Sequence, residues 1–127
     1  AAVLESLRFE PAVASIPRLA VEDISLDGHV IPRGSPVLLS TMSSLRDPDF
    51  FLDPGQFNLT RPQGKWHPVF GGGEHRCLGE ALARIEMEEA LTALVNSLLD
   101  LEVGDQKLNI RGHAGIRQVD ELVVRWR

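Results

Sequence analysis

Apolar positions recur at helical spacing in two parts of the chain. Near the N-terminus Val3, Leu4 and Leu7 share one face, and Pro11 ends the pattern because the residue before a proline is pushed out of the α region. We therefore predict a short helix over residues 1–9. A longer stripe consists of Leu78, Leu82, Ile85, Leu91, Leu94, Val95 and Leu98. It predicts a long helix over 78–97 whose apolar face packs in a core.

Two other regions carry brief extended runs. Residues 12–39 are interrupted by Asp27-Gly28 and Pro32-Arg33-Gly34, which are typical turn sequences, so small antiparallel strands are predicted there. The predicted strands cover 13–16, 21–26, 30–31 and 36–39. The tail, 99–127, returns to short extended pieces separated by glycines. These pieces are predicted around 99–103, 107–110 and 122–126.

The stretch 47–76 has no hydrophobic period and is rich in Pro, Gly and Asp. A loop of this length inside a compact domain is usually functional. Its aromatic residues are expected to pin it to the body of the protein. The whole pattern predicts one α+β unit with a short leading helix, small antiparallel sheets, a long ordered loop and one long helix.

Residues 70–79 join a glycine-rich loop to the predicted long helix and carry the one cysteine of the chain, Cys77. A thiolate at a helix N-terminus is stabilised by the helix dipole and by free backbone N–H groups, which suits a metal ligand. The glycines at 71–73 and 79 let the backbone approach a large flat group, and Ala81 and Ala83 keep the first helical turn slim. Phe70 can shield the sulfur.

Composition and charge narrow the classes of function. The chain is 43% apolar and 24% charged, as in a soluble globular protein. Its net charge of -5 gives no general attraction to nucleic acid or to an anionic membrane. One cysteine cannot form an internal disulfide, and no run of about 18 apolar residues is present. We expect a reducing, cytoplasmic compartment, and we interpret the start without Met, inside a predicted helix, as a cut end.

Other interpretations of the cysteine loop are weaker. A lone cysteine is often only a buried thiol. A zinc site from His67, His75 and Cys77 lacks a fourth ligand and ordinary spacing. A Cys-His nucleophile lacks an orienting third group. Arg76 stands where a dinucleotide fingerprint needs its third glycine.

The positions of Phe70, Gly73, Cys77 and Gly79 resemble the haem-binding signature of the cytochrome P450 family, and His75 and Arg76 are permitted between them. Upstream, Glu5-Ser6-Leu7-Arg8 resembles the family's Glu-x-x-Arg motif. Further matches recur in family order at 17–23, 31–34, 46–48, 51, 53–54 and 57. The resemblance covers essentially the whole chain and identifies it with the C-terminal third of the family's fold.

The resemblance implies roles for particular residues. Cys77 would be the axial ligand of the haem iron, and Arg18 and His75 would contact the haem propionates. The remaining members of the implied haem-binding set are Phe70, Gly71, Gly73, Gly79 and Ala83. Segments 12–16 and 112–116 would face the substrate pocket.

The Glu-x-x-Arg motif implies a further, structural role. Glu5 and Arg8 would pair and anchor the meander loop, 47–69. The position before Phe57, often an arginine that joins this pair, is Gln56. That third contact is therefore expected to be weakened or supplied elsewhere.

Through the resemblance, the implied activity is that of a haem-thiolate monooxygenase that uses haem b and dioxygen to insert one oxygen atom into a small organic substrate. A peroxide-using relative would share these motifs. A ferredoxin or flavin-domain electron donor is implied, and the basic residues Arg61, Lys65, Arg76 and Arg84 form either its docking patch or a mixed solvated surface.

The alternative function is that of a truncated, catalytically incompetent piece. Everything N-terminal to the Glu-x-x-Arg helix is absent, so one face of a bound haem would stay open to water. Weak or absent haem binding is then expected, unless the missing part or self-association covers the open side. The apolar stripe on 78–98 would be partly bare.

Overall fold

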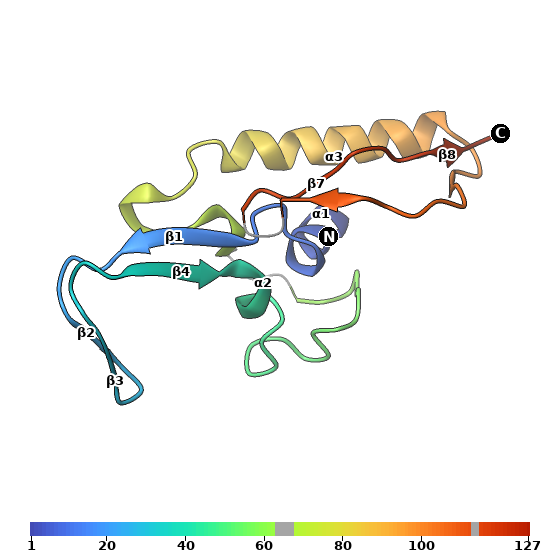
Figure 1. Ribbon diagram of the computed structural model, residues 1–127. Coiled ribbons are helices and arrows are strands. Elements are labelled where there is room, and N and C mark those ends of the chain that lie inside the picture. Colours follow the sequence, from blue (N-terminus) through green and yellow to red (C-terminus); the bar gives the residue numbers. More distant parts are fainter. Residues whose placement is uncertain (63–67, 113–114) are drawn as a thin grey trace.

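The computed structural model describes residues 1–62, 68–112 and 115–127, which form a mixed α and β arrangement (Figure 1). The α-helices are α1 (Ala2–Phe9), α2 (Thr41–Ser44) and α3 (Glu80–Ser97). Two 3-10 turns, η1 (Pro68–Phe70) and η2 (Gly73–His75), precede α3. Within the described residues, no helix has the length and apolar character needed to cross a bilayer.

The N-terminal strands form two antiparallel pairs. Strand β1 (Ser15–Leu19) pairs with β4 (Pro36–Ser40), and between them β2 (Ile24–Leu26) and β3 (His29–Ile31) make a hairpin. Asp27 and Gly28 both have positive φ, 47° and 78°, as a two-residue type I′ turn requires. The predicted antiparallel strands are confirmed. However, the predicted bounds 13–16 and 21–26 were wrong. Strand β1 starts at Ser15 and runs through Pro17 to Leu19, and β2 starts only at Ile24.

The C-terminal strands also form two short pairs. Strand β5 (Glu102–Val103) pairs with β8 (Val124–Arg125), and β6 (Ile110–Arg111) pairs with β7 (Gln118–Val119). Neither β7 nor α2 was predicted, because elements of two to four residues are too short to show a hydrophobic period.

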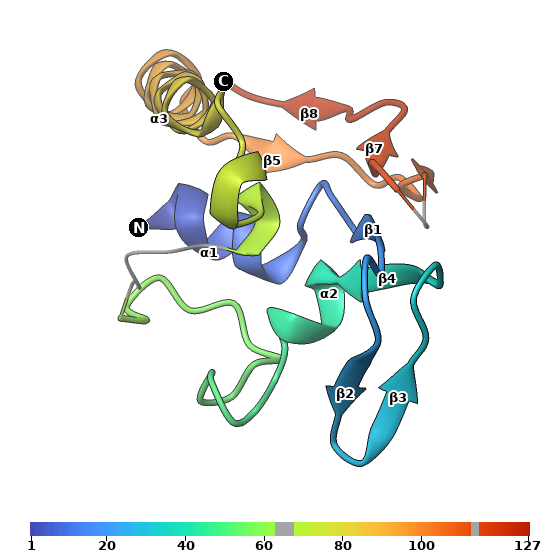
Figure 2. The ribbon, with the colours of Figure 1, turned by 90° about the vertical axis from the view of Figure 1, so that its left-hand side faces the viewer.

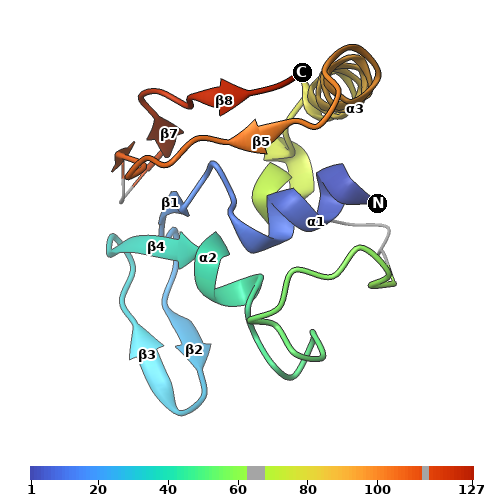
Figure 3. The ribbon, with the colours of Figure 1, turned by 90° about the vertical axis from the view of Figure 1, so that its right-hand side faces the viewer.

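The elements lie in layers, with α1 in the middle. Helix α3 and the C-terminal strands lie on one side of α1, while β1, β4, α2 and the loop that follows α2 lie on the other (Figures 2 and 3). The β2–β3 hairpin projects from the body (Figure 1). Few apolar side chains of the described residues are buried: Val3, Ala14, Leu45 and Val69 lie on or beside α1 and α2, and Ala20 lies just after β1.

Helix α3 begins two residues later than predicted, and its packing is the main correction. None of its 18 residues, all within the described part of the chain, is buried. Leu82 is 62% exposed and Val95 is 70% exposed. The prediction that this stripe packs in a core is therefore wrong for these residues, and the expectation of a bare stripe agrees with the structure.

Candidate functional site

The cysteine loop is shaped by its turns. Gly71 and Gly73 have positive φ, 72° and 67°, which glycine adopts without strain. The backbone N–H of Cys77 donates to the carbonyl of Phe70 at 2.8 Å, and that of Arg76 donates to Gly73 at 3.2 Å. These bonds close the loop on itself and leave Cys77 exposed.

The thiol of Cys77 lies just before α3. Gly79 is the N-cap and provides no side-chain cap for the first turn of the helix. The first backbone N–H groups of a helix have no intrahelical partner and carry its positive dipole end, so an anion beside them is stabilised. A Cβ on Gly79 would lie 3.9 Å from the cysteine Sγ, so even a methyl group there would touch the sulfur.

Beside the cysteine, Glu80 organises two arginines. Its carboxylate lies 2.8 Å from Arg76 Nε and 3.2 Å from Arg84 Nη2. The Arg84 guanidinium lies 5.7 Å from the centroid of the Phe70 ring, within cation–π range. These two arginines are therefore partly neutralised, which weakens the predicted basic patch. Lys65 of that patch lies outside the described residues.

A second cluster surrounds Glu5 and Arg8. Arg8 donates to both oxygens of Glu5, at 2.9 Å and 2.8 Å, and both side chains are buried. The rest of the guanidinium donates to main-chain carbonyls of Leu45 (3.0 Å), Pro54 (2.9 Å) and Gln56 (2.9 Å). The pair thus holds the loop after α2 through backbone atoms.

Arg61 completes this cluster. Its Nε lies 3.3 Å from the Glu5 carboxylate, and its guanidinium also donates to the carbonyls of Leu52, Asp53 and Gln56. The third contact is therefore supplied by Arg61, while Gln56 contributes its carbonyl. Placing Arg61 in a surface patch was wrong. The unused acceptor capacity of Glu5 was the signal for a further donor, but sequence spacing could not identify which one.

Electrostatics follow from these contacts. The hydrogen bond from Arg8 is the main cause that lowers the pKa of Glu5 to about 2. Burial opposes this effect, and the backbone N–H of Asn58, which donates to the carboxylate at 2.8 Å, adds to it. Glu5 is consequently ionised throughout the physiological range.

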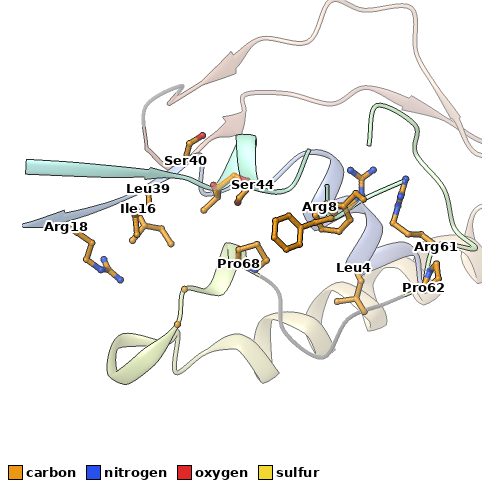
Figure 4. Close-up of a pocket in the computed structure, with 15 residues that line it drawn as sticks. Leu4, Arg8, Ile16, Arg18, Leu39, Ser40, Ser44, Arg61, Pro62 and Pro68 are labelled. Atoms are coloured by element: carbon orange, nitrogen blue, oxygen red, sulfur yellow. Dashed lines mark hydrogen bonds between the residues drawn. The ribbon is translucent and has the colours of Figure 1, made fainter. Parts of the chain in front are cut away.

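A pocket of about 760 Å³ separates the cysteine loop from β1, β4 and α1 (Figure 4). Ile16, Arg18 and Leu39 lie at one end, and Leu4 and Arg61 at the other. Arg18 is exposed and donates to the neighbouring carbonyl of Pro17 at 2.8 Å.

The pocket unites only part of the predicted site. Arg18 and Gly71 of the predicted haem-binding set line it, and so does Arg8 of the predicted structural pair, whereas the other predicted haem-binding residues are not among its lining residues. Those others lie on the cysteine loop and in the first turns of α3: Phe70, Gly73, His75, Cys77, Gly79 and Ala83.

The residues present fit a haem. An exposed thiol stands at a helix N-terminus, the adjacent Leu78 is fully exposed, and Arg18 is an open cationic group on the same side as the pocket. An iron ligand, an apolar surface and a cation for a carboxylate suit an iron macrocycle that is apolar and carries carboxylates. The residues fit a zinc ion less well. His67 lies outside the described residues, and among those described no group of three or more His, Cys, Asp or Glu could hold a metal ion.

The chain is similar to proteins of one family. The family model "Cytochrome P450" matches residues 1–114. "Cytochrome P450-pinF1, plant-inducible" of Rhizobium radiobacter is 50% identical over 125 residues, covering 98% of this chain and 30% of the relative. "Biotin biosynthesis cytochrome P450" of Bacillus subtilis is 37% identical over 123 residues, covering 97% and 31%.

Two solved structures have the same arrangement. P450BioI in complex with hexadec-9Z-enoic acid ligated acyl carrier protein superposes with a TM-score of 0.92 at 35% identity, over 98% of this chain and 32% of that one. The tirandamycin C-bound P450 monooxygenase TamI gives 0.92 at 36% identity, over 99% and 32%. This chain spans about 30% of the length of the curated relatives it matches. It belongs to the cytochrome P450 family.

Proposed function

We propose that this chain forms the thiolate side of a haem-thiolate monooxygenase, with Cys77 as the ligand of the haem iron. The observation that carries the proposal is the exposed thiol held between a closed glycine loop and the N-terminus of α3. Free N–H groups and the helix dipole favour the anionic sulfur that a ferric iron binds. When bound, the haem supplies dioxygen activation and the transfer of one oxygen atom to an organic substrate.

The other residues orient the cofactor. Arg18 would bind a propionate from the pocket side, and His75 would bind one from the cysteine loop. Gly71 and Gly73 would let the backbone come close to the macrocycle, as would Gly79 and Ala83 at the start of α3. Phe70, which lies against Arg84, would shield the sulfur once the haem is bound.

The Glu5–Arg8–Arg61 cluster holds the end of the pocket opposite Arg18, where Arg8 and Arg61 are lining residues (Figure 4). It fixes the loop after α2, and Pro62 at the end of that stretch lines the same pocket as Arg18. Its role is therefore to hold the wall of the pocket rather than to touch the reacting atoms.

Partners follow from the same chemistry. A monooxygenase needs electrons, and a ferredoxin or flavin-domain protein docking beside Cys77 would deliver them. A small organic substrate would lie against 12–16 and 115–116; His113 and Ala114 lie outside the described residues. Reduced Cys77 suits a cytoplasmic compartment, since thiols persist there. One relative has been solved with an acyl carrier protein, so a carrier-bound acyl chain is one substrate class to test.

A second candidate function rests on the bare face of α3. Leu82, Ile85 and Val95 are each more than half exposed, so these 127 residues leave much apolar surface in water. A haem bound on one face alone would be open to solvent. In this alternative, the isolated chain binds haem weakly or not at all and acts only as an interaction or structural piece.

The test is a carbon monoxide difference spectrum of the reduced chain after addition of haem, with the mass of the chain measured in parallel. We expect the red-shifted Soret band of thiolate-ligated haem, and its loss in Cys77→Ala. Arg33→Ala, a change on the turn between β3 and β4, is the matched control and should keep the band. Haem that binds equally to both proteins without that band would sink the assignment of Cys77, and no binding at all would favour the second candidate.

A further inference from the structure

We infer that Arg117 is a positioning residue that fixes the substrate-facing wall, by tying residues 12–14 and 115–116 to the C-terminal end of α1. The inference rests on the proposed function, because that function gives these segments their place beside the substrate. Among the described residues, Arg117 contacts Glu10, Pro11 and Ala12 and not the cysteine loop. Its effect would therefore reach the substrate through the wall and not through the iron ligand.

The two segments are paired through their backbones. Val13 and Ile116 form an isolated antiparallel bridge, with Ala14 N–H donating to Gly115 at 2.9 Å and Arg117 N–H donating to Ala12 at 2.6 Å. On the other side, Thr41 donates its hydroxyl to Val13 and its N–H to Ala14. The Val13 segment is thus bonded to the C-terminal segment on one side and to Thr41 on the other.

The side chain of Arg117 adds a charged link to this bridge. Its Nη1 lies 2.6 Å from a carboxylate oxygen of Glu10 and 3.5 Å from the carbonyl of Pro11, and the side chain is only 12% exposed. Glu10 is the C-cap of α1, so Arg117 joins the C-terminal segment to the end of the helix that carries Arg8. A cation here also complements the negative end of the helix dipole.

Arg46 holds the other side of the same carboxylate. Its Nη2 lies 3.2 Å from Glu10 and 2.5 Å from the carbonyl of Phe9, and its guanidinium lies 4.4 Å from the Phe9 ring centroid. Glu10 is therefore shared by two arginines, one from the loop after α2 and one from the C-terminal segment. Arg46 also donates to the carbonyl of Phe9, one of those that the end of α1 leaves without an intrahelical partner.

The wall that this link holds is apolar and open. Ile116 is 75% exposed, and the paired segment continues into Ile16, which lines the pocket. An apolar side chain fixed in an exposed position by backbone bonds on both strands is suited to contact an organic ligand. A bulky ligand would feel a shift of this wall, while a ligand that reaches only the iron would not.

The first arm of the test is amide hydrogen exchange on the complete 127-residue chain without added haem. In Arg117→Ala we expect the backbone amides of residues 14 and 117 to exchange about tenfold faster. This is the factor that corresponds to the loss of one charge-assisted hydrogen bond. Arg117→Lys should restore most of the protection. Arg111→Ala is the matched control, because Arg111 is exposed and pairs with Asp120 instead. Unchanged exchange in Arg117→Ala would overturn the inference.

The second arm separates positioning from general stability in the haem-loaded chain. Imidazole probes access to the iron, and clotrimazole probes the iron together with the wall. We expect Arg117→Ala to weaken clotrimazole about tenfold and imidazole less than about twofold. Equal weakening of both ligands would reduce Arg117 to a merely structural residue and overturn the inference. Absence of a thiolate-type Soret band in the parent chain would count against the proposed function alone, and the exchange arm would still decide the positioning.

Discussion

At the residue scale, Glu5 and Arg8 show how a buried charge can be stable. Each is almost inaccessible to water, and together with Arg61 and the Asn58 N–H they satisfy one another. The sequence could predict the Glu5–Arg8 pair from its spacing. It could not predict Arg61, because a contact across 56 residues depends on how the intervening loop folds back.

The lowered pKa of Glu5 predicts acid sensitivity. A carboxylate whose folded-state pKa lies below its unfolded value stabilises the fold above the unfolded value, and this stabilisation is lost as the pH falls. For Glu5 the window runs from about 4.5 down to about 2. We expect the urea midpoint to fall through that window.

Two variants test this assignment. Glu5→Gln leaves Arg8 buried without its carboxylate, so a loss of about 3–5 kcal/mol at neutral pH is expected, with a flatter profile in acid. Arg61→Gln should fold and lose less. Glu22→Gln, at an exposed position, is the control and should leave the profile unchanged. A wild-type midpoint that stays constant from pH 5 to about 2 would contradict the assignment.

At the scale of the element, local chemistry decided what could be predicted. Pro11 marked the end of α1 and the Asp27-Gly28 turn marked the hairpin, because both restrict the backbone directly. The cysteine loop was recognisable from its glycines and Cys77. Strands β5 to β8 have two residues each, so glycines and tertiary pairing set their bounds instead of a period.

Gly112 illustrates an element that one residue controls. Its φ is 79°, and a Cβ added there would clash with the carbonyl oxygen of Ile116. Gly112→Ala should therefore displace the turn and cost about 1–3 kcal/mol in urea unfolding. Gly55→Ala, where a Cβ would meet nothing within 4 Å, should change stability by less than about 1 kcal/mol. Equal costs for the two variants would show that the turn is not constrained in this way.

At the scale of the whole molecule, the main feature is the apolar surface that α3 leaves exposed to water. The face of α3 that the hydrophobic pattern assigned to a core is bare, because its pattern specifies burial without specifying the partner. The fold class was predictable from the resemblance and the local signals. What covers the rest of α3 was not, since α1 contacts the helix but leaves side chains such as Leu82 and Val95 mostly exposed in the described part of the chain.

This surface predicts self-association of the 127-residue chain. Sedimentation velocity should show a concentration-dependent rise in mass, because apolar patches of this kind gain free energy when they leave water. The double variant Leu82→Lys and Val95→Lys should suppress it without lowering the urea midpoint, since both side chains are exposed. Ser43→Lys, at an exposed position of α2, is the control. A monomer at all concentrations would argue against this expectation.

Arg8 holds the loop after α2 by hydrogen bonds to main-chain carbonyls, which leaves the side chains of that loop open to substitution during evolution. The carbonyls of Leu45, Pro54 and Gln56 are present whatever side chains those positions carry. The loop's path is thus encoded in two arginines, Arg8 and Arg61, and in main-chain geometry, and exposed side chains along it, such as that of Gln56, are free to change. A surface that can change its chemistry without changing its course offers a route by which related enzymes acquire new docking partners while keeping one scaffold.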